Sequence, residues 1–280
     1  MEIIDISEEN VDTFLPFLGE DLSEDMKRVY FNGIGALDEG GRAAGAFVYE
    51  LLNAESEEDT RGRICLLKAE NKEIADGLKD CYSQTSVKEN EIVESFFVLE
   101  SEDDAKSLAE SGFSIEKKEA DTIVVTLEEL GKTILGKKKK IPACVANIED
   151  LSVLQFRDAV KQILFKGHKG LLEDIPFLPK SWFDNKVSAC VRSGEKIPGL
   201  FLLRRTPSGT LIPVLLFAYG PEFQKNLMYM IRYSVQAAEQ HYPPETTIQI
   251  DRKNAVTKGL TDQLLPGKTG EEIFFGTRRE

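Results

Sequence analysis

Histidine, tryptophan and cysteine are scarce in this chain of 280 residues, which has two histidines, one tryptophan and four cysteines. The cysteines are widely spaced and form no C-x-x-C pair, whereas a zinc site needs closely paired ligands. We therefore expect no metal, and we expect buried free thiols. The four cysteines are Cys65, Cys81, Cys144 and Cys190.

Long apolar runs are also missing. No segment approaches the roughly 20 consecutive apolar residues that a membrane helix needs. The first ten residues are acidic, and they lack the basic segment and apolar core of a secretory signal. The sequence therefore predicts a cytoplasmic protein with no membrane partner.

Basic residues are few in the first part of the chain. Residues 1–130 hold 33 acidic and 12 basic residues, and residues 131–280 hold 15 acidic and 23 basic ones. This asymmetry indicates two separate units, and it would let the two halves attract each other. The basic residues of the second half are scattered and form no stripe with aromatic residues, so we expect no nucleic-acid partner.

The length and the 41% content of hydrophobic residues suit two medium-sized domains with packed cores. Glycines, four consecutive lysines at 137–140 and Pro142 mark an exposed connector. The lysines would alternatively contact nucleic acid or anionic lipid. We divide the chain into an N-terminal domain at 1–130, a linker at 131–144 and a C-terminal domain at 145–280.

Apolar periodicity and turn signals predict similar orders of elements in the two halves. In the first half we expect helices near 8–18 and 23–31, strands at 44–52 and 63–68, a helix at 72–83, a strand at 92–99, a helix between Ser101 and Gly112, and a closing strand at 122–127. In the second half we expect a helix from Ser152 to Gly167, a helical stretch at 171–184, strands at 187–192, 199–204 and 211–219, a long helix at 225–241, a strand at 247–250, a helix at 255–265 and a last strand at 272–276.

This order of elements resembles the GNAT superfamily of acyl-CoA-dependent N-acyltransferases. Pro221-Glu222-Phe223-Gln224 is similar to the P-E-[YF]-[RQ] sequence that leads from the family's fourth strand into its pyrophosphate-binding loop. Ser111-Gly112-Phe113 resembles the G-F that follows the helix near the CoA thiol. The resemblance covers most of the chain as an order of elements. It implies two tandem GNAT-like α/β domains, each with a mixed, mostly antiparallel sheet flanked by helices.

The resemblance also implies where acetyl-CoA would bind. In the family, a [QR]-x-x-G-x-[GA] loop points backbone N–H groups at the CoA pyrophosphate, and the following helix adds its dipole. In this sequence, the implied contacts are Phe217, Tyr219, Gln224, Lys225, Asn226, Leu227 and Asn254 in the second half, and Lys72, Ala75 and Gly77 in the first. A turn or a helix cap is an alternative role for Asn254.

Both halves depart from the family pattern. Leu227 and Tyr229 are bulky where glycine or alanine belongs, and we expect them to fill the space of a phosphate. In the first half the sizes are nearly suitable, but Glu70, Glu73 and Asp76 bring negative charge to the loop.

The tyrosine that often protonates the leaving thiolate in this family has no counterpart, since Leu108 and Gln263 stand at the corresponding positions. The candidate general bases are three carboxylates on or next to predicted strands, each of which would alternatively face solvent: Glu50, Glu94 and Asp251.

Three hypotheses follow from these observations. The first is an N-acyltransferase that moves an acetyl or acyl group from CoA to a small-molecule or peptide amine. The second is a catalytically inactive binding or interaction protein on the same fold. The third is a scaffold for dimerisation, which leaves the oligomeric state open. The acidic first half favours a cationic acceptor, because summed negative potential concentrates cations.

Overall fold

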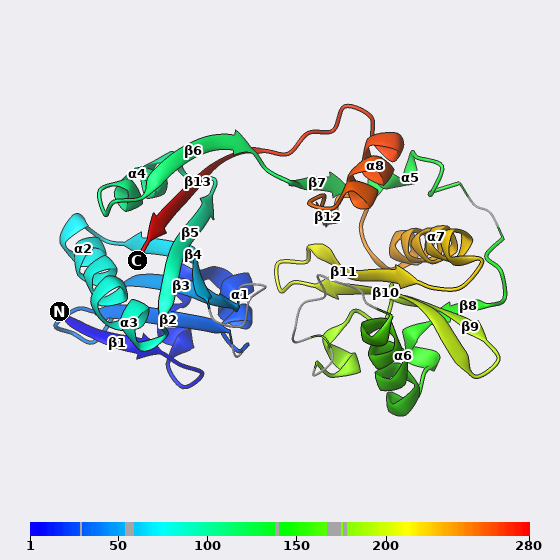
Figure 1. The fold of residues 1–280 in the computed structure, drawn as a ribbon, viewed down its shortest axis with the longest axis horizontal. Coiled ribbons are helices and arrows are strands. Elements are labelled where there is room, and N and C mark those ends of the chain that lie inside the picture. Colours follow the sequence, from blue (N-terminus) through cyan, green and yellow to red (C-terminus); the bar gives the residue numbers. More distant parts are fainter. Residues whose placement is uncertain (29, 54–58, 138–139, 167–174, 176–177) are drawn as a thin grey trace. The chain divides into compact units, whose positions relative to one another are not determined.

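The computed structural model describes residues 1–28, 30–53, 59–137, 140–166, 175 and 178–280 (Figure 1). The chain forms two compact units. The first unit consists of Met1–Ala120 together with Glu271–Glu280, and the second consists of Asp121–Gly270. The first unit therefore contains both ends of the chain described here.

The first unit is built on a mixed sheet in which only β4 and β5 are parallel neighbours. This arrangement confirms the predicted mixed, mostly antiparallel sheet. In spatial order the strands are β1 (Glu2–Ile6), β2 (Phe31–Leu37), β3 (Ala43–Asn53), β4 (Thr60–Ala69), β5 (Ile92–Leu99), β13 (Glu272–Arg279) and β6 (Ser114–Glu119).

Helices lie on both faces of this sheet. On one face, η1 (Val11–Phe14) and α1 (Leu15–Asp25) bury Phe14 and Leu18 in a core with Val48. On the other face lie α2 (Lys72–Cys81), the π-helical turn η2 (Tyr82–Ser86), α3 (Val87–Glu89) and α4 (Glu102–Ala109). They pack over a second core, which contains Leu78 and Phe97.

Two glycines explain why the strand β2 was not expected from the sequence. The expected helix at 23–31 does not form, since α1 ends at Asp25 and β2 begins at Phe31; residue 29 lies outside the described residues. Gly33 and Gly35 weaken the strand pattern of β2. A side chain at Gly35 would collide with the ring of Phe14, so glycine is the residue that lets η1 pack closely on the sheet.

The second unit has a sheet of its own, in which β11 and β12 are the parallel neighbours. Its strands, in spatial order, are β7 (Thr122–Thr126), β12 (Thr247–Asp251), β11 (Leu211–Ala218), β10 (Lys196–Arg205), β9 (Ala189–Ser193) and β8 (Val145–Asn147). The helices are α5 (Leu127–Gly131), η3 (Ile148–Asp150), α6 (Val153–Phe165), η4 (Lys180–Trp182), α7 (Phe223–His241) and α8 (Ala255–Leu264).

The helices α6 and α7 lie on opposite faces of the second sheet (Figure 1). Phe156 and Ile163 of α6 belong to one core, and Ile231 and Val235 of α7 belong to the other. Most of the predicted helical stretch at 171–184 lies outside the described residues, and its described end forms the short helix η4.

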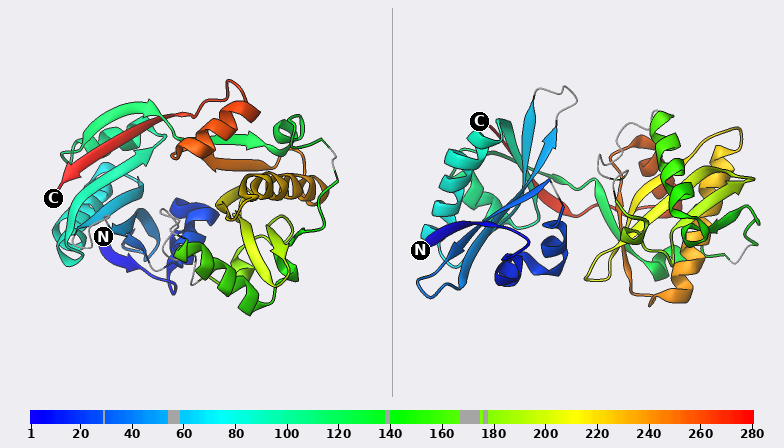
Figure 2. Two further views of the ribbon diagram at one scale, coloured as in Figure 1. Left: turned by 45° about the vertical axis from the view of Figure 1, so that its right-hand side comes forward. Right: turned by 90° about the horizontal axis from the view of Figure 1, so that it is seen from below.

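The two units exchange strands. The segment at 122–127 was expected to close the first sheet, but as β7 it pairs with β12 of the second sheet, from Thr122 with Asp251 to Thr126 with Thr247. Conversely, β13 was expected to end the second unit, but it lies between β5 and β6 of the first, where it appears in red in Figure 2. The division of contacts therefore differs from the sequence-based boundary at residue 130, because strand pairing is decided by contacts far apart in the chain.

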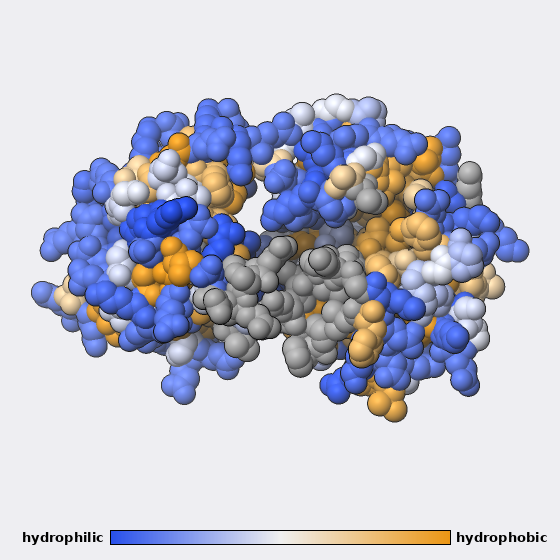
Figure 3. Space-filling model, in the orientation of Figure 1, coloured by the Kyte–Doolittle hydropathy of each residue, from blue (hydrophilic) through white to orange (hydrophobic). Residues whose placement is uncertain are grey.

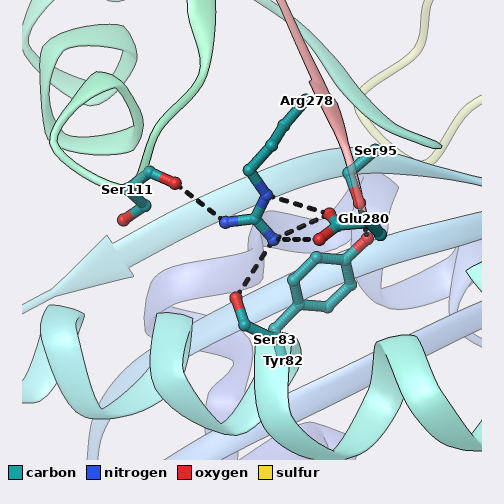
Figure 4. A network of polar contacts seen from close by, with 6 residues as sticks. All are labelled: Tyr82, Ser83, Ser95, Ser111, Arg278 and Glu280. Atoms are coloured by element: carbon teal, nitrogen blue, oxygen red, sulfur yellow. Dashed lines mark hydrogen bonds and ion pairs between the residues drawn. The ribbon is translucent and has the colours of Figure 1, made fainter. Parts of the chain in front are cut away.

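A polar network holds β13 in the first unit (Figure 4). The Arg278 guanidinium donates to the carbonyl oxygen of Ser111 at 2.9 Å and to Oγ of Ser83 at 3.1 Å. It also forms an ion pair with Glu280 at 2.7 Å, and it lies 4.7 Å from the ring centre of Phe113. These contacts tie the strand to both the α2–η2 segment and the turn before β6.

The thiols and the surface complete the description of the units. All four cysteines are free, but only Cys190 is fully buried and the other three are half-buried, so the expectation of buried thiols holds for one of them. Burial raises the pKa of the Cys190 thiol to about 11.

None of the helices in the described parts of the chain is long and apolar enough to cross a bilayer. On the face drawn in Figure 3, apolar residues are exposed in separate patches.

Candidate functional site

The parallel strands β4 and β5 separate partway along their length. Their pairing runs from Thr60 with Ile92 to Ile64 with Phe97. Beyond this point β4 stays paired with β3 as far as Ala69, while β5 stays paired with β13 as far as Leu99. The sheet therefore opens as a fork between the carboxyl ends of the two strands.

A cavity of about 630 Å³ lies at this fork. Its walls come from the end of β4, the start of α2, the length of α4 and one residue of α1. The lining residues are Phe17, Leu67, Lys68, Ala69, Asn71, Lys72, Ala75, Asp103, Asp104, Lys106, Ser107 and Glu110. Lys72 and Ala75 were both expected to contact a ligand, and the structure brings them together here.

Tyr82 contacts both strands just before they separate (Figure 4). The centre of its ring lies 4.8 Å from that of Phe47 and 5.0 Å from that of Tyr49. Its hydroxyl forms a hydrogen bond of 2.7 Å with the hydroxyl of Ser95 on β5. A side chain at Gly62 of β4 would collide with the Tyr82 hydroxyl, so glycine is required there. Burial raises the pKa of Tyr82, which keeps the phenol neutral.

Three residues at the N-terminus of α2, Asn71, Lys72 and Ala75, line the cavity. Asn71 caps the helix: its side-chain oxygen accepts from the Ile74 amide at 3.0 Å, and its carbonyl oxygen accepts from the Ala75 amide at 3.1 Å. In an α-helix the first N–H groups have no partner within the helix. The cap therefore leaves the amides of Lys72 and Glu73 as the donors at this end.

The expected phosphate-binding loop of the first half does not form at Lys72, Ala75 and Gly77. The cap at Asn71 follows β4 by only two residues, so these three positions lie within α2, where the amides of Ala75 and Gly77 belong to helical hydrogen bonds. A side chain at Gly77 would meet Met1 and Ile3, away from the cavity. Only Lys72 and Ala75 remain in a position to contact a ligand at the fork.

One of the three carboxylates expected beside this loop has an ion pair. Asp76 forms an ion pair of 2.8 Å with Lys79. Lys72 on α2 pairs with Glu110 at the end of α4, also at 2.8 Å, and this hydrogen bond lowers the pKa of the Glu110 carboxyl below its usual range. Three lysines and three carboxylates line the cavity, so its charge is balanced.

The second unit has a corresponding pair of parallel strands, β11 and β12. Only one pair, Leu211 with Ile248, joins β11 to β12. Leu227 and Tyr229 pack against the core that contains this pair. Because α7 starts at Phe223, the residues matched to the family loop lie inside a helix here as well. Glycines at these positions would favour a loop. Bulky apolar side chains instead favour a helix here, because the helix lets them bury apolar surface against the core.

The other residues expected to contact a ligand in the second unit lie around the start of α7. The rings of Phe217 and Tyr219 are 6.4 Å apart, and the Tyr219 hydroxyl donates to Gln162 at 2.7 Å. Lys225 forms an exposed ion pair of 3.1 Å with Glu222. The remaining two are Gln224, which is exposed, and Asn226, whose amide donates to the Glu222 carbonyl oxygen.

Asn254 and Asp251 have local structural roles. The Asn254 side chain accepts from the Thr257 amide at 2.7 Å and thereby caps α8. Asp251 is exposed and accepts from the Lys253 amide at 2.7 Å.

Glu50 and Glu94, in contrast, lie on one face of the first sheet next to the fork. Each forms an ion pair with an arginine of β4: Glu50 with Arg63 at 2.5 Å, and Glu94 with Arg61 at 2.6 Å. Sequence reasoning did not single out these two arginines. The sequence did contain a signal for them: the two arginines are two residues apart in a predicted strand, and alternate residues of a strand share a face.

No protein-family model matches the sequence, and no curated protein matches it. Among solved structures, a tandem GNAT protein from the clavulanic acid biosynthesis pathway superposes with a TM-score of 0.65 at 10% identity, and the match covers 99% of this chain and 98% of that one. The chain has the tandem GNAT fold. The predicted pair of GNAT-like halves is thereby confirmed at the level of fold.

Two further solved structures superpose over 99% of the chain. One is a GCN5-related glucosamine N-acetyltransferase region in a fungal multi-domain β-N-acetylglucosaminidase, with a TM-score of 0.58, 9% identity and 38% of that chain covered. The other is a GCN5-related N-acetyltransferase from Anabaena variabilis, with a TM-score of 0.51, 14% identity and 73% of that chain covered. These likenesses describe the fold, and the chemistry depends on the site.

Proposed function

We propose that this protein is an acyl-CoA-dependent N-acyltransferase whose acyl-CoA site is the fork of the first unit. The observation that carries this proposal is the cavity of about 630 Å³ lined by the end of β4, the start of α2 and the length of α4. It lies at the capped N-terminus of α2, where backbone amides and the helix dipole favour an anion. In the second unit the bulky Leu227 and Tyr229 stand at the loop positions and pack against the core, which makes the first unit the better candidate.

The residues of the cavity suit the parts of an acyl-CoA. The amides of Lys72 and Glu73 and the ammonium groups of Lys68 and Lys106 would face the diphosphate. Leu67 and Ala75 would contact the apolar part of the pantetheine arm. When bound, acyl-CoA supplies an activated acyl thioester. Lys72 becomes available to a phosphate only if it leaves Glu110, and this ion pair is exposed and therefore weak.

Glu94 is the carboxylate best placed to take a proton from the acceptor amine. It lies on β5 three residues before Phe97, where the fork begins, and its side chain is 32% exposed. Glu50 is nearly fully buried against Arg63, so an acceptor would reach it less readily. The proposed acceptor is a small-molecule or peptide amine that approaches on this face.

Filling the cavity tests the acyl-CoA site directly. Ala75→Trp should weaken acetyl-CoA binding by about 100-fold or more, because the indole would occupy the space between α2 and α4. Calorimetric titration of the full chain measures this change. Asp80→Trp, at an exposed position on the same helix, is the matched control and should bind as the wild type does. Failure of the wild type to bind acetyl-CoA at millimolar concentration would remove the proposal.

Replacing the proposed proton acceptor separates chemistry from binding. Glu94→Gln should lower kcat for CoA release by roughly 100-fold, the lower end of what general bases contribute, and should leave the Kd for acetyl-CoA unchanged. The assay follows thiol release with a panel of amines. An unchanged kcat would show that Glu94 takes no proton, and a changed Kd would show that its role is structural.

A catalytically inactive binding protein is the second candidate. It is favoured by the fact that the positions matched to the family loop lie within α2 in the first unit and within α7 in the second. This candidate predicts that acetyl-CoA either does not bind or binds without any CoA release to any amine.

A further inference from the structure

Two arginines of β4 stand beside the fork on the face of the sheet that carries Glu50 and Glu94. In the strand register, Arg63 is opposite Phe96 and the preceding arginine, Arg61, is opposite Glu94. The next pair of that register, Ile64 with Phe97, is the last one before the strands separate. Arg63 is thus one residue, and Arg61 three residues, before the point where β4 leaves β5.

The hydrogen-bonding capacity of these guanidinium groups is only partly used. Arg61 donates through Nη2 to Glu94, and Arg63 donates through Nη2 to Glu50. The Nε atoms of both are buried, and neither has a hydrogen-bond partner among the residues that the structure describes. The Nε atoms themselves are buried, but the two side chains are 40% and 38% exposed, so part of each remains open to a ligand. Two partly satisfied guanidinium groups on one face suit a bidentate carboxylate.

An apolar surface adjoins the arginines. The Arg61 guanidinium lies 4.8 Å from the ring centre of Phe96, whose ring is in turn 6.3 Å from that of Phe275 on β13. Val98, two residues beyond Phe96 on the same face, is 44% exposed. The face therefore combines donors for an anion with an apolar surface for the rest of a ligand.

The charge near the fork is locally balanced. Arg279 of β13 is exposed and stands opposite Glu94 in the register. The three arginines Arg61, Arg63 and Arg279 are therefore near Glu50 and Glu94, and the Asp25 carboxylate also acts on Arg63. Exposed charges more than about 8–10 Å away are largely screened at physiological salt. The overall acidity of the first half, which had favoured a cationic acceptor, is therefore largely offset at this face.

We propose that Arg61 and Arg63 bind a carboxylate of the acceptor, and that the acceptor is an amine of the amino-acid class. This inference rests on the proposed function and names the substrate class of its acceptor side. With the carboxylate on the arginines, the amine lies on the same face as Glu94 and the fork. Arg61 and Arg63 are positioning residues that set specificity.

Direct binding tests this anion site without turnover. The probes are N-acetyl-L-alanine and N-acetyl-L-alaninamide, which differ in whether they carry a carboxylate, titrated calorimetrically into the full chain. The acid should bind the wild type at least about 10-fold more tightly than the amide, the effect expected from charge-assisted hydrogen bonds. Arg61→Met should abolish this preference, and Arg61→Lys should restore part of it. Arg42→Met, which removes another exposed, ion-paired arginine, is the matched control and should preserve it.

The Arg61→Met chain leaves Glu94 without its partner, so Arg61→Met combined with Glu94→Gln keeps the charge balanced and should also lack the preference. Equal binding of acid and amide to the wild type, binding of neither, or a preference that survives both variants overturns the inference.

Failure of the inference and failure of the proposed function give different results. Suppose that acetyl-CoA binds and that amines without a carboxylate support CoA release as fast as amino acids do. The acyltransferase proposal then stands, and the proposal of a carboxylate site is refuted. If acetyl-CoA does not bind but the wild type prefers the acid through Arg61, the carboxylate site stands and the acyltransferase is lost.

Discussion

A chain that stops at Gly270 should keep the second unit folded and lose the first. The missing strand β13 lies between β5 and β6 and pairs with both. It also carries Gly276, which packs closely against the buried ring of Phe97, and Arg278, which holds the network of Figure 4. Losing a strand that pairs on both sides should cost about as much free energy as the whole stability of a typical domain, about 5–15 kcal/mol. Hydrogen exchange should show loss of protection in β3–β5 and retained protection in β10 and β11.

A rejoined chain provides the matched control. Glu119 at the end of β6 is paired with Glu272 at the start of β13, and the Ala120 amide donates to the Glu271 carbonyl oxygen at 2.8 Å. Residues 1–120 connected to 271–280 through an Asn-Gly turn should therefore form a hairpin and fold as the first unit alone. A fragment of residues 1–130 should not fold. Cooperative unfolding of that fragment would contradict the exchange of strands.

Truncation of Tyr82 is expected to cause the largest loss of stability among single substitutions at the fork. Tyr82→Ala removes a fully buried ring that packs against Phe47 and Tyr49, so it should lower the free energy of unfolding of the first unit by about 3–5 kcal/mol. Tyr82→Phe keeps the ring and leaves the buried Ser95 hydroxyl without its partner, which should cost about 1–3 kcal/mol. Urea unfolding, followed by hydrogen exchange in β4 and β5, measures both changes.

Tyr219→Phe is the control for the loss of a hydroxyl. Tyr219 also donates to a side chain, Gln162, but this bond is exposed, so we expect a change below about 0.5 kcal/mol. A Tyr82→Ala change below about 1 kcal/mol would show that Tyr82 does not hold β4 and β5 together below the fork.

Local signals predicted the elements that depend on local interactions. The apolar run at 92–99 is β5, the stretch at 72–83 begins with α2, and Ser101 caps α4 by accepting from the Asp104 amide at 3.2 Å. These features come from neighbouring residues, whose spacing is visible in the sequence. The strands β1, β2 and β6 were not expected, since they are short, rich in glycine or highly charged, and they form because neighbouring strands pair with them.

The candidate site was predicted less completely than the fold. Lys72 and Ala75 do line the cavity, but Gly77 faces β1, and the family loop is replaced by the first turns of α2. A match to the loop motif does not show where the following helix begins. In this chain the cap at Asn71 starts α2 before the matched positions. Arg61 and Arg63 were not singled out, because their partners are distant in the sequence.

The sequence by itself determined that the chain has two α/β halves in the order of GNAT elements, because helix periodicity, strand alternation and caps are local properties. Only the tertiary structure decided which strand closes which sheet, where β4 and β5 separate, and which side chains line the cavity beside β4. These outcomes depend on pairings such as that of Glu272 with Glu119. Contacts between residues so far apart leave no pattern in a single sequence.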